Sequence, residues 1–265
     1  MVLSGTRFTT SGQERLRAVG SRPAKRNAPM PAARRMNTRN RLLLALPRQD
    51  QEQLWPDLHL VAWSIGQTLY GVGEPIEHVY FVEQGVASIV TIMADGSTSE
   101  VGMIGPEGLV GVAALLGAKT SAQHVVVQIP GTALRMNAGL CKAAFEQRSA
   151  FRAIAHKFIN SFLNLSAQTA ACNRLHSVEQ RCARWLLMAS DRTRSDIMPV
   201  THEFLASMIG ARRTGVTAIA RKLRRAGLID YRHGRITIID HEGLEAVACE
   251  CYGIDHARLR GPLGC

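Results

Sequence analysis

The chain has 265 residues, of which 46% are hydrophobic and 20% charged, and its formal net charge is +11. This length favours two domains over one, and no run approaches the roughly 18 apolar residues that a membrane span requires, so we expect no membrane-embedded segment. The positive charge favours a polyanionic partner such as nucleic acid.

Residues 1–35 form a basic segment in which eight Lys and Arg side chains stand against Glu14, a local charge of +7. The segment has no sustained hydrophobic periodicity and is rich in Arg, Ala, Pro, Ser and Gly, which predicts a disordered tail; an arm that touches DNA is the alternative. Met36 is a second candidate for the start of translation. The segment lacks the apolar core of a secretory signal, and we expect a cytoplasmic protein.

The next part of the chain is β-rich. Short β-like runs broken by glycines between about 58 and 136 predict a compact all-β sensor domain, which we bound at 36–149. The pair Asp95-Gly96 predicts a tight hairpin, because Asp-Gly readily adopts positive φ angles. The pair Pro130-Gly131 predicts a second turn.

A helical pattern follows, and we bound this helix at 150–172. Its apolar positions recur at alternating spacings of three and four and include Phe151, Ile154, Phe158, Phe162 and Leu165. Such a coiled-coil-like seam favours pairing with a second copy of the chain, while packing against the chain's own sensor domain is the alternative.

Residues 173–245 are predicted to form a second domain. Ser177 and Gln180 resemble a capping box that opens its first helix. Thr201 is predicted to cap a short helix that ends near Gly210, and another helix runs from about 213 to 225. A β-hairpin then surrounds His233-Gly234. This order is typical of a winged helix-turn-helix, and we interpret 246–265 as a C-terminal tail.

The second short helix carries the predicted contacts with DNA. Eight Lys and Arg residues between 201 and 235 face only two acids, a local charge of +6. Arginine can bond two acceptors of guanine at once, whereas contacts with phosphates add affinity without reading sequence. The predicted base contacts are Arg212, Arg213, Thr214, Thr217 and Ala218. The predicted phosphate contacts are Arg221, Lys222, Arg224, Arg225, Arg232 and Arg235.

Residues 201–205, 210–217 (Gly-Ala-Arg-Arg-Thr-Gly-Val-Thr) and 226–229 resemble the Crp/Fnr family of bacterial regulators. Gly66, residues 79–85 and Asp95-Gly96 resemble the cyclic-nucleotide-binding β-roll of these regulators. The resemblance covers roughly 55 to 245. It implies an α+β chain with an N-terminal double-stranded β-roll, a long dimerisation helix and a C-terminal winged helix-turn-helix. It also implies a homodimer that binds palindromic double-stranded DNA, with RNA polymerase as a further partner.

The sensor departs from the family members that bind a cyclic nucleotide. Those members usually carry a Gly-Glu-Leu-like turn and, further along, Arg-Ser or Arg-Ala. The matching stretches here are Gly111-Val112-Ala113 and Thr120-Ser121-Ala122. Losing the phosphate-pairing cation removes a charge-assisted bond. We therefore place a candidate effector pocket at Gly111, Val112, Thr120 and Ser121 and assign no cyclic nucleotide, other effector or cofactor.

The sequence assigns no metal site and no catalytic residue. The six cysteines lack the paired spacings of a zinc site; Cys249 and Cys251 lie near His241 and Glu250, but ordinary packing is our interpretation. No cysteine precedes Cys141, which argues against an N-terminal iron–sulfur cluster. Motifs of catalysis are missing, so we predict a regulator rather than an enzyme. The alternative is a ligand-binding dimer whose winged helix serves as a protein-interaction module.

Overall fold

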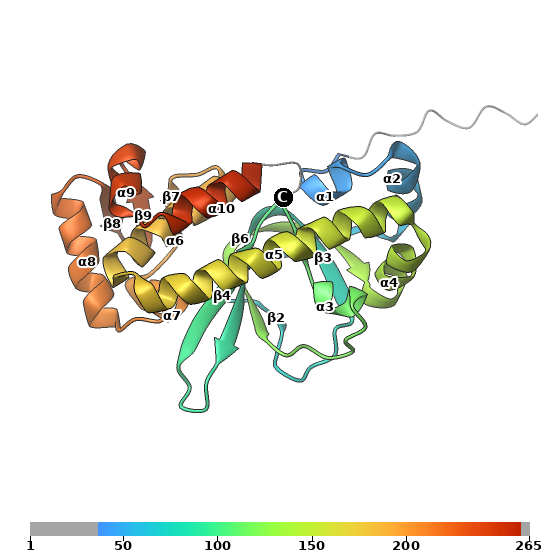
Figure 1. Ribbon diagram of the computed structural model, residues 1–265, viewed down its shortest axis with the longest axis horizontal. Coiled ribbons are helices and arrows are strands. Elements are labelled where there is room, and N and C mark those ends of the chain that lie inside the picture. The colour runs from blue at the N-terminus through green and yellow to red at the C-terminus, as the bar shows by residue number, and fades with distance from the viewer. Residues whose placement is uncertain (1–36, 261–265) are drawn as a thin grey trace, which may run out of the picture. The chain divides into compact units, whose positions relative to one another are not determined.

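The structure is a computed structural model that describes residues 37–260 (Figure 1), so the predicted tail at 1–35 lies outside the described residues. Its N-terminal part is a β-sheet domain with short flanking helices. These elements are α1 (Arg41–Leu44), α2 (Arg48–Leu54), η1 (Trp55–Asp57), β1 (His59–Trp63), β2 (Thr68–Tyr70), β3 (His78–Ile92), β4 (Thr98–Ile104), β5 (Leu109–Val110), α3 (Val112–Leu115), β6 (His124–Asn137) and α4 (Ala138–Gln147).

The antiparallel sheet is built around its two longest strands, β3 and β6. Strand order is β1-β6-β3-β4, with β2 also pairing with β6 and β5 with β3. The predicted hairpin joins β3 to β4: Gly96 has φ +81°, and Asp95 Oδ1 accepts a hydrogen bond of 2.9 Å from the Ser97 amide. Phe81 and its neighbours on β3 are fully buried in the core. The expectation of an N-terminal β domain is confirmed.

The predicted turn at Pro130-Gly131 is wrong. Strand β6 continues through both residues, and Gly131 pairs with Trp63 of β1. A Cβ at Gly131 would lie only 2.7 Å from the amide nitrogen of Gly85 on β3. Glycine inside a strand often marks such a close approach of two backbones. The local sequence carried the signal of a turn, but the requirement here is for space between strands.

Helix α5 (Ser149–Leu175) packs its apolar stripe against the sheet domain of its own chain. The Phe151 ring lies 6.2 Å from the Phe81 ring. Gly108 and Gly102 leave room for Phe158 and Phe162, because a Cβ on either glycine would lie within 2.8 Å of the corresponding ring. The predicted dimer contact through Phe151, Ile154, Phe158, Phe162 and Leu165 is therefore wrong, and these residues belong to the internal cores.

The C-terminal domain contains the predicted helices and wing. Its elements are α6 (Val178–Thr193), β7 (Ile197–Met198), α7 (His202–Met208), α8 (Arg213–Arg225), β8 (Ile229–Arg232), β9 (Arg235–Ile238), α9 (His241–Val247) and α10 (Cys251–Arg260). Ser177 and Gln180 form the predicted capping box of α6. His233 and Gly234 both have positive φ angles in the turn between β8 and β9, as a tight hairpin requires.

The segment predicted as a tail, 246–265, instead contains helix α10. This helix packs on α5 and α6 (Figure 1), and Asp255 of α10 accepts hydrogen bonds from the Arg184 guanidinium of α6, the shorter one 2.6 Å long. Both side chains are buried, so the C-terminal helix is part of the core of this region. None of the helices within residues 37–260 is long and apolar enough to cross a membrane.

Glu100 of β4 is a buried carboxyl group in the sheet domain. Its Oε2 accepts hydrogen bonds from Ser88 Oγ (2.6 Å) and Gln128 Nε2 (3.3 Å). Burial raises the pKa of Glu100, and this effect outweighs the lowering by Ser88 and by the Arg192 and Arg184 charges. Glu100 therefore takes up its proton more readily in the folded state than in the unfolded state.

This pKa shift predicts the pH dependence of a Glu100→Gln variant. As pH rises above the ordinary glutamate pKa of about 4.3, the unfolded state loses its proton first, so wild-type stability falls until the pH passes the folded-state pKa. The glutamine variant lacks this loss, and we expect it to be the more stable protein near neutral pH and about equally stable near pH 4. Urea unfolding at a series of pH values measures the difference; a difference that does not change with pH would contradict the prediction.

Candidate nucleic-acid interface

Helices α7 and α8 form a helix-turn-helix held by local capping and an apolar seam. Thr201 Oγ1 accepts a hydrogen bond of 3.1 Å from the Phe204 amide and so caps α7. Gly210, with φ +59°, makes the turn. The buried residues of α8 are Val216, Ala220 and Leu223, spaced so that one face points at the core. The opposite face of α8 is left to solvent.

The five predicted base-contact residues lie together on the N-terminal half of α8 and its cap. Arg212, Arg213, Thr214 and Ala218 are exposed, and Thr217 is half-buried. Thr217 Oγ1 lies 3.4 Å from His202 Nδ1 of α7. The Arg213 guanidinium lies 3.7 Å from the Glu203 carboxylate, and both side chains are more than 70% exposed. So open an ion pair contributes little to stability and leaves the arginine able to rearrange.

The six predicted phosphate contacts fall into two groups. Arg221, Arg225 and Arg235 are exposed. The others form ion pairs within the chain: Lys222 with Glu179 at 2.7 Å, and Arg224 and Arg232 with Asp230 at 2.8 and 3.1 Å. The Arg224 guanidinium also stacks 5.0 Å above the ring of Tyr231. Arg224 thus links α8 to the wing.

An open groove lies between the N-terminal ends of α7 and α8 and the wing. It is lined by Val200, Thr201, His202, Glu203, Arg213, Tyr231, Arg232, Gly234, Arg235 and Ile236. Sequence reasoning missed His202, Glu203 and Tyr231, although the first two directly follow the Thr201 cap. The His202 ring lies 4.7 Å from the Tyr231 ring. Burial, followed by the Arg213 and Arg221 charges, lowers the pKa of His202, which keeps the ring neutral at pH 7.

The candidate effector residues flank the segment between β2 and β3. Gly111, with φ +96°, precedes α3, and a Cβ there would lie 2.7 Å from Tyr70 Oη. Thr120 bridges to Pro75, and the buried Ser121 donates a hydrogen bond of 2.7 Å to the Gln123 carbonyl. Two of the four candidates are thus occupied by contacts with their own chain. None of the four carries the charge that a cyclic phosphate needs as a partner.

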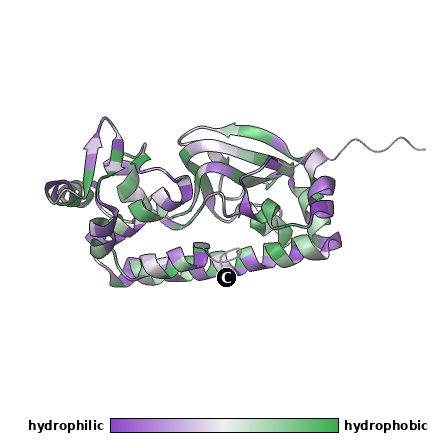
Figure 2. Cartoon of the chain, turned by 90° about the horizontal axis from the view of Figure 1, so that it is seen from above, coloured by the Kyte–Doolittle hydropathy of each residue, from purple (hydrophilic) through white to green (hydrophobic). Residues whose placement is uncertain are grey.

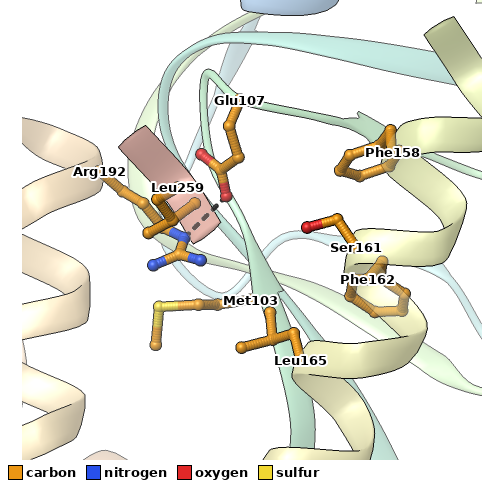
Figure 3. A pocket seen from close by; sticks show the side chains of 8 residues that line it. All are labelled: Met103, Glu107, Phe158, Ser161, Phe162, Leu165, Arg192 and Leu259. Atoms are coloured by element: carbon orange, nitrogen blue, oxygen red, sulfur yellow. Dashed lines mark hydrogen bonds and ion pairs between the residues drawn. The ribbon is translucent and has the colours of Figure 1, made fainter. Parts of the chain in front are cut away.

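A separate pocket lies where β4, α5, α6 and α10 meet (Figure 3). Its residues are Met103, Glu107, Phe158, Ser161, Phe162, Leu165, Arg192 and Leu259. The Arg192 Nε donates a hydrogen bond of 2.8 Å to Glu107 Oε1 and so ties α6 to the loop that follows β4. The pocket volume is about 30 Å³. This is room for a water molecule but too little for a nucleotide.

Comparison with known proteins identifies both halves of the chain. Residues 60–148 match the cyclic nucleotide-binding domain, and residues 180–247 match the Crp-like helix-turn-helix domain. The transcriptional regulator LdrP of Thermus thermophilus is 27% identical over 195 residues, which cover 69% of this chain and 93% of LdrP.

Two solved structures share the fold. FixK2 from Bradyrhizobium japonicum superposes with a TM-score of 0.62 at 15% identity, over 72% of this chain and 98% of FixK2. The c-di-GMP-responsive global regulator CLP of Xanthomonas campestris superposes with a TM-score of 0.60 at 17% identity, over 73% of this chain and 100% of CLP.

Proposed function

The chain belongs to the Crp/Fnr family of transcriptional regulators, and from this premise we propose that it binds a palindromic operator as a homodimer in the cytoplasm. The observation that carries the proposal is the exposed N-terminal half of α8 beside the wing, with three unpaired arginines around it at Arg221, Arg225 and Arg235. A helix of this kind fits the major groove, and its arginines suit guanine edges and phosphates. RNA polymerase is the further partner of such a regulator.

The solvent face of α5 supports dimer formation. Seven exposed residues follow one another along it at alternating spacings of three and four: Ala153, His156, Asn160, Leu163, Ala167, Ala170 and Arg174. This is the heptad spacing of a coiled coil, and it lies on the side of α5 away from the buried stripe. Hydrophilic and hydrophobic residues alternate along α5 (Figure 2). Small residues allow close approach, and an Asn in such a seam favours a two-stranded register.

The proposed assembly has two-fold symmetry, so the two copies of α8 read two half-sites. For a helix-turn-helix dimer these half-sites lie about 34 Å apart, one turn of DNA. The signal at the β-roll is unidentified. Because the candidate effector pocket lacks the charged groups that a cyclic nucleotide requires, we propose that the dimer binds DNA without one.

A Leu163→Glu substitution tests the dimer face. Leu163 is 63% exposed in the single chain, and two copies would meet near the symmetry axis. We expect the dimer dissociation constant to rise at least tenfold, about 1.4 kcal/mol, because the two glutamates repel each other. Sedimentation equilibrium measures the change, with Leu60→Glu as the control, since Leu60 is similarly exposed on β1. Equal behaviour of the two variants would show that α5 does not pair through this face.

The experiment that tests the function is selection of binding sites from random duplex DNA with the full chain, followed by titration of the enriched site at two salt concentrations. We expect an inverted repeat, bound without added ligand, with an affinity that falls as salt rises. No enrichment, with or without cyclic nucleotides, would overturn the proposal and favour a winged helix that binds protein. Enrichment only after a nucleotide is added would overturn the ligand-independent part alone.

A further inference from the structure

Three cysteines and one histidine from distant parts of the sequence meet beside the end of α5. Cys172 and His176 are separated by one helical turn, with His176 at the C-cap of α5. Cys249 lies in the link between α9 and α10, and Cys251 is the first residue of α10. Their three Sγ atoms and one imidazole nitrogen all lie within 4.8 Å of one another. The fold therefore assembles a Cys₃His set that the sequence spacing conceals.

The spacing of these atoms fits a single tetrahedral ion. Zinc–sulfur bonds of about 2.3 Å and zinc–nitrogen bonds of about 2.0 Å place sulfurs about 3.8 Å apart and a sulfur about 3.6 Å from a nitrogen. Here Cys172 Sγ lies 3.5 Å from Cys249 Sγ, and Cys251 Sγ lies 3.6 Å from His176 Nδ1. An iron–sulfur cluster spreads its ligands over several iron atoms and needs a wider arrangement. The set matches one metal ion.

Neighbouring polar groups orient the candidate ligands. His176 Nε2 lies 3.2 Å from Glu250 Oε1, so the carboxylate holds the proton on Nε2 and leaves the Nδ1 lone pair toward Cys251. A carboxylate behind a histidine is the usual outer support of a zinc ligand. The Gln168 side-chain amide donates a hydrogen bond of 3.0 Å to Cys251 Sγ. Cysteines that serve only as packing do not require either partner.

Burial and charge also suit a metal–thiolate centre. The three cysteines are at most 4% exposed, and the His176 side chain is 16% exposed. Zinc with three thiolates carries a net charge of −1, which is costly to bury without a compensating cation. The buried Arg184 guanidinium supplies that charge: it bonds Thr169 Oγ1 of α5 at 3.0 Å and interacts electrostatically with Cys172 and Cys251.

We infer that Cys172, His176, Cys249 and Cys251 form a zinc site that fastens the C-terminal segment to the junction of α5 and α6. Four protein ligands leave no open position, so the site is structural rather than catalytic. The ion binds as Zn²⁺, and the thiols release their protons to solvent. Because α6 begins immediately after His176, with Ser177 as its cap, the ion holds α10 against the hinge between the two domains. The inference does not depend on DNA binding.

The first test is the metal content of the full chain, purified under reducing conditions without added metal and measured by inductively coupled plasma mass spectrometry. We expect about one zinc per chain, in keeping with one closed site. Exchange of zinc for Co²⁺ gives a second readout, because tetrahedral cobalt with thiolate ligands absorbs strongly in the visible and near-ultraviolet. Both measurements are made on the wild-type protein and need no variant to fold.

Variants then identify the ligands. Cys172→Ala and Cys251→Ser are expected to lose the zinc and the cobalt absorption. Cys141→Ala, which replaces an equally buried cysteine of the sheet domain, keeps both and is the matched control. Glu250→Gln changes an exposed side chain that is not a ligand, so folding is retained. For this variant we expect a 10- to 100-fold loss of zinc affinity in competition with a chromophoric chelator, roughly the effect of losing an outer-shell carboxylate.

Three results would overturn the inference. A folded, reduced chain that retains no zinc and gives only the weak absorption of octahedral cobalt would show that the four residues do not bind metal. Iron and sulfide at the site would replace zinc with a cluster. A Cys172–Cys249 disulfide, detected by mass spectrometry in protein purified without reductant and unchanged by zinc, would identify a redox pair instead.

Discussion

An Arg213→Ala variant is expected to bind the selected operator at least 30-fold more weakly than the wild-type chain. A bidentate arginine contact with guanine discriminates bases by about 1–3 kcal/mol, and a dimer loses one such contact in each half-site, about 2–6 kcal/mol in total. Arg213 is 71% exposed at the start of α8 and lines the groove beside the wing. Fluorescence anisotropy titrations with the operator and with random duplex DNA measure the loss.

The matched control is Arg235→Ala on the wing. As a phosphate contact, Arg235 should contribute equally to every sequence, so its loss weakens operator and random DNA alike and reduces the salt dependence by about 0.9 per contact. Lys222 was also predicted to bind phosphate, but its pairing with Glu179 at 2.7 Å makes it a poorer control. If Arg213→Ala weakened both DNAs equally, its role in reading bases would be refuted.

Removing the buried carboxylate in Asp255→Ala is expected to lower the free energy of unfolding by about 3–5 kcal/mol. The change leaves the Arg184 guanidinium charged and buried, with a side chain only 8% exposed. Removing one partner of a buried pair is far more costly than replacing both, because the remaining charge has lost its compensation. Urea unfolding followed by tryptophan fluorescence gives the measurement, since Trp185 lies on α6 next to Arg184.

Glu52→Ala serves as the control for this prediction. Glu52 pairs with Arg48 one helical turn away, and both side chains are well exposed. Such a pair contributes about 0.3–0.5 kcal/mol. A similar small loss for Asp255→Ala would mean that α10 does not stabilise the domain, and the description of this helix as part of the core would have to be abandoned.

Local sequence signals predicted every feature that depends only on near neighbours. The Asp95-Gly96 hairpin, the Ser177 capping box, the Thr201 cap and the His233-Gly234 turn all follow from backbone preferences and short-range hydrogen bonds. The fold class followed from the order of β and helical patterns. The resemblance to the Crp/Fnr family was correct for the same reason, because the helix-turn-helix residues lie close together in the chain.

Predictions that needed long-range contacts failed. The apolar stripe of α5 has the spacing of a dimer seam, but periodicity records only that a face is buried and does not name its partner. In the folded chain Phe151 and Phe158 meet the sensor sheet, and the exposed Leu163 lies on the other face. Pro130-Gly131 failed similarly, since the need for glycine comes from β3 across the sheet.

The Cys₃His set marks the same limit most clearly. Sequence proximity associated Cys249 and Cys251 with His241, but His241 instead pairs with Asp196 at 2.6 Å. The partners of the two cysteines are Cys172 and His176, more than seventy residues away along the chain. The sequence by itself determined the helices, turns, basic face and family of this protein, because those depend on local geometry and charge. Only the tertiary structure decided what covers the long helix, where the C-terminal helix docks and which side chains share a site, because those contacts form only when distant segments pack together.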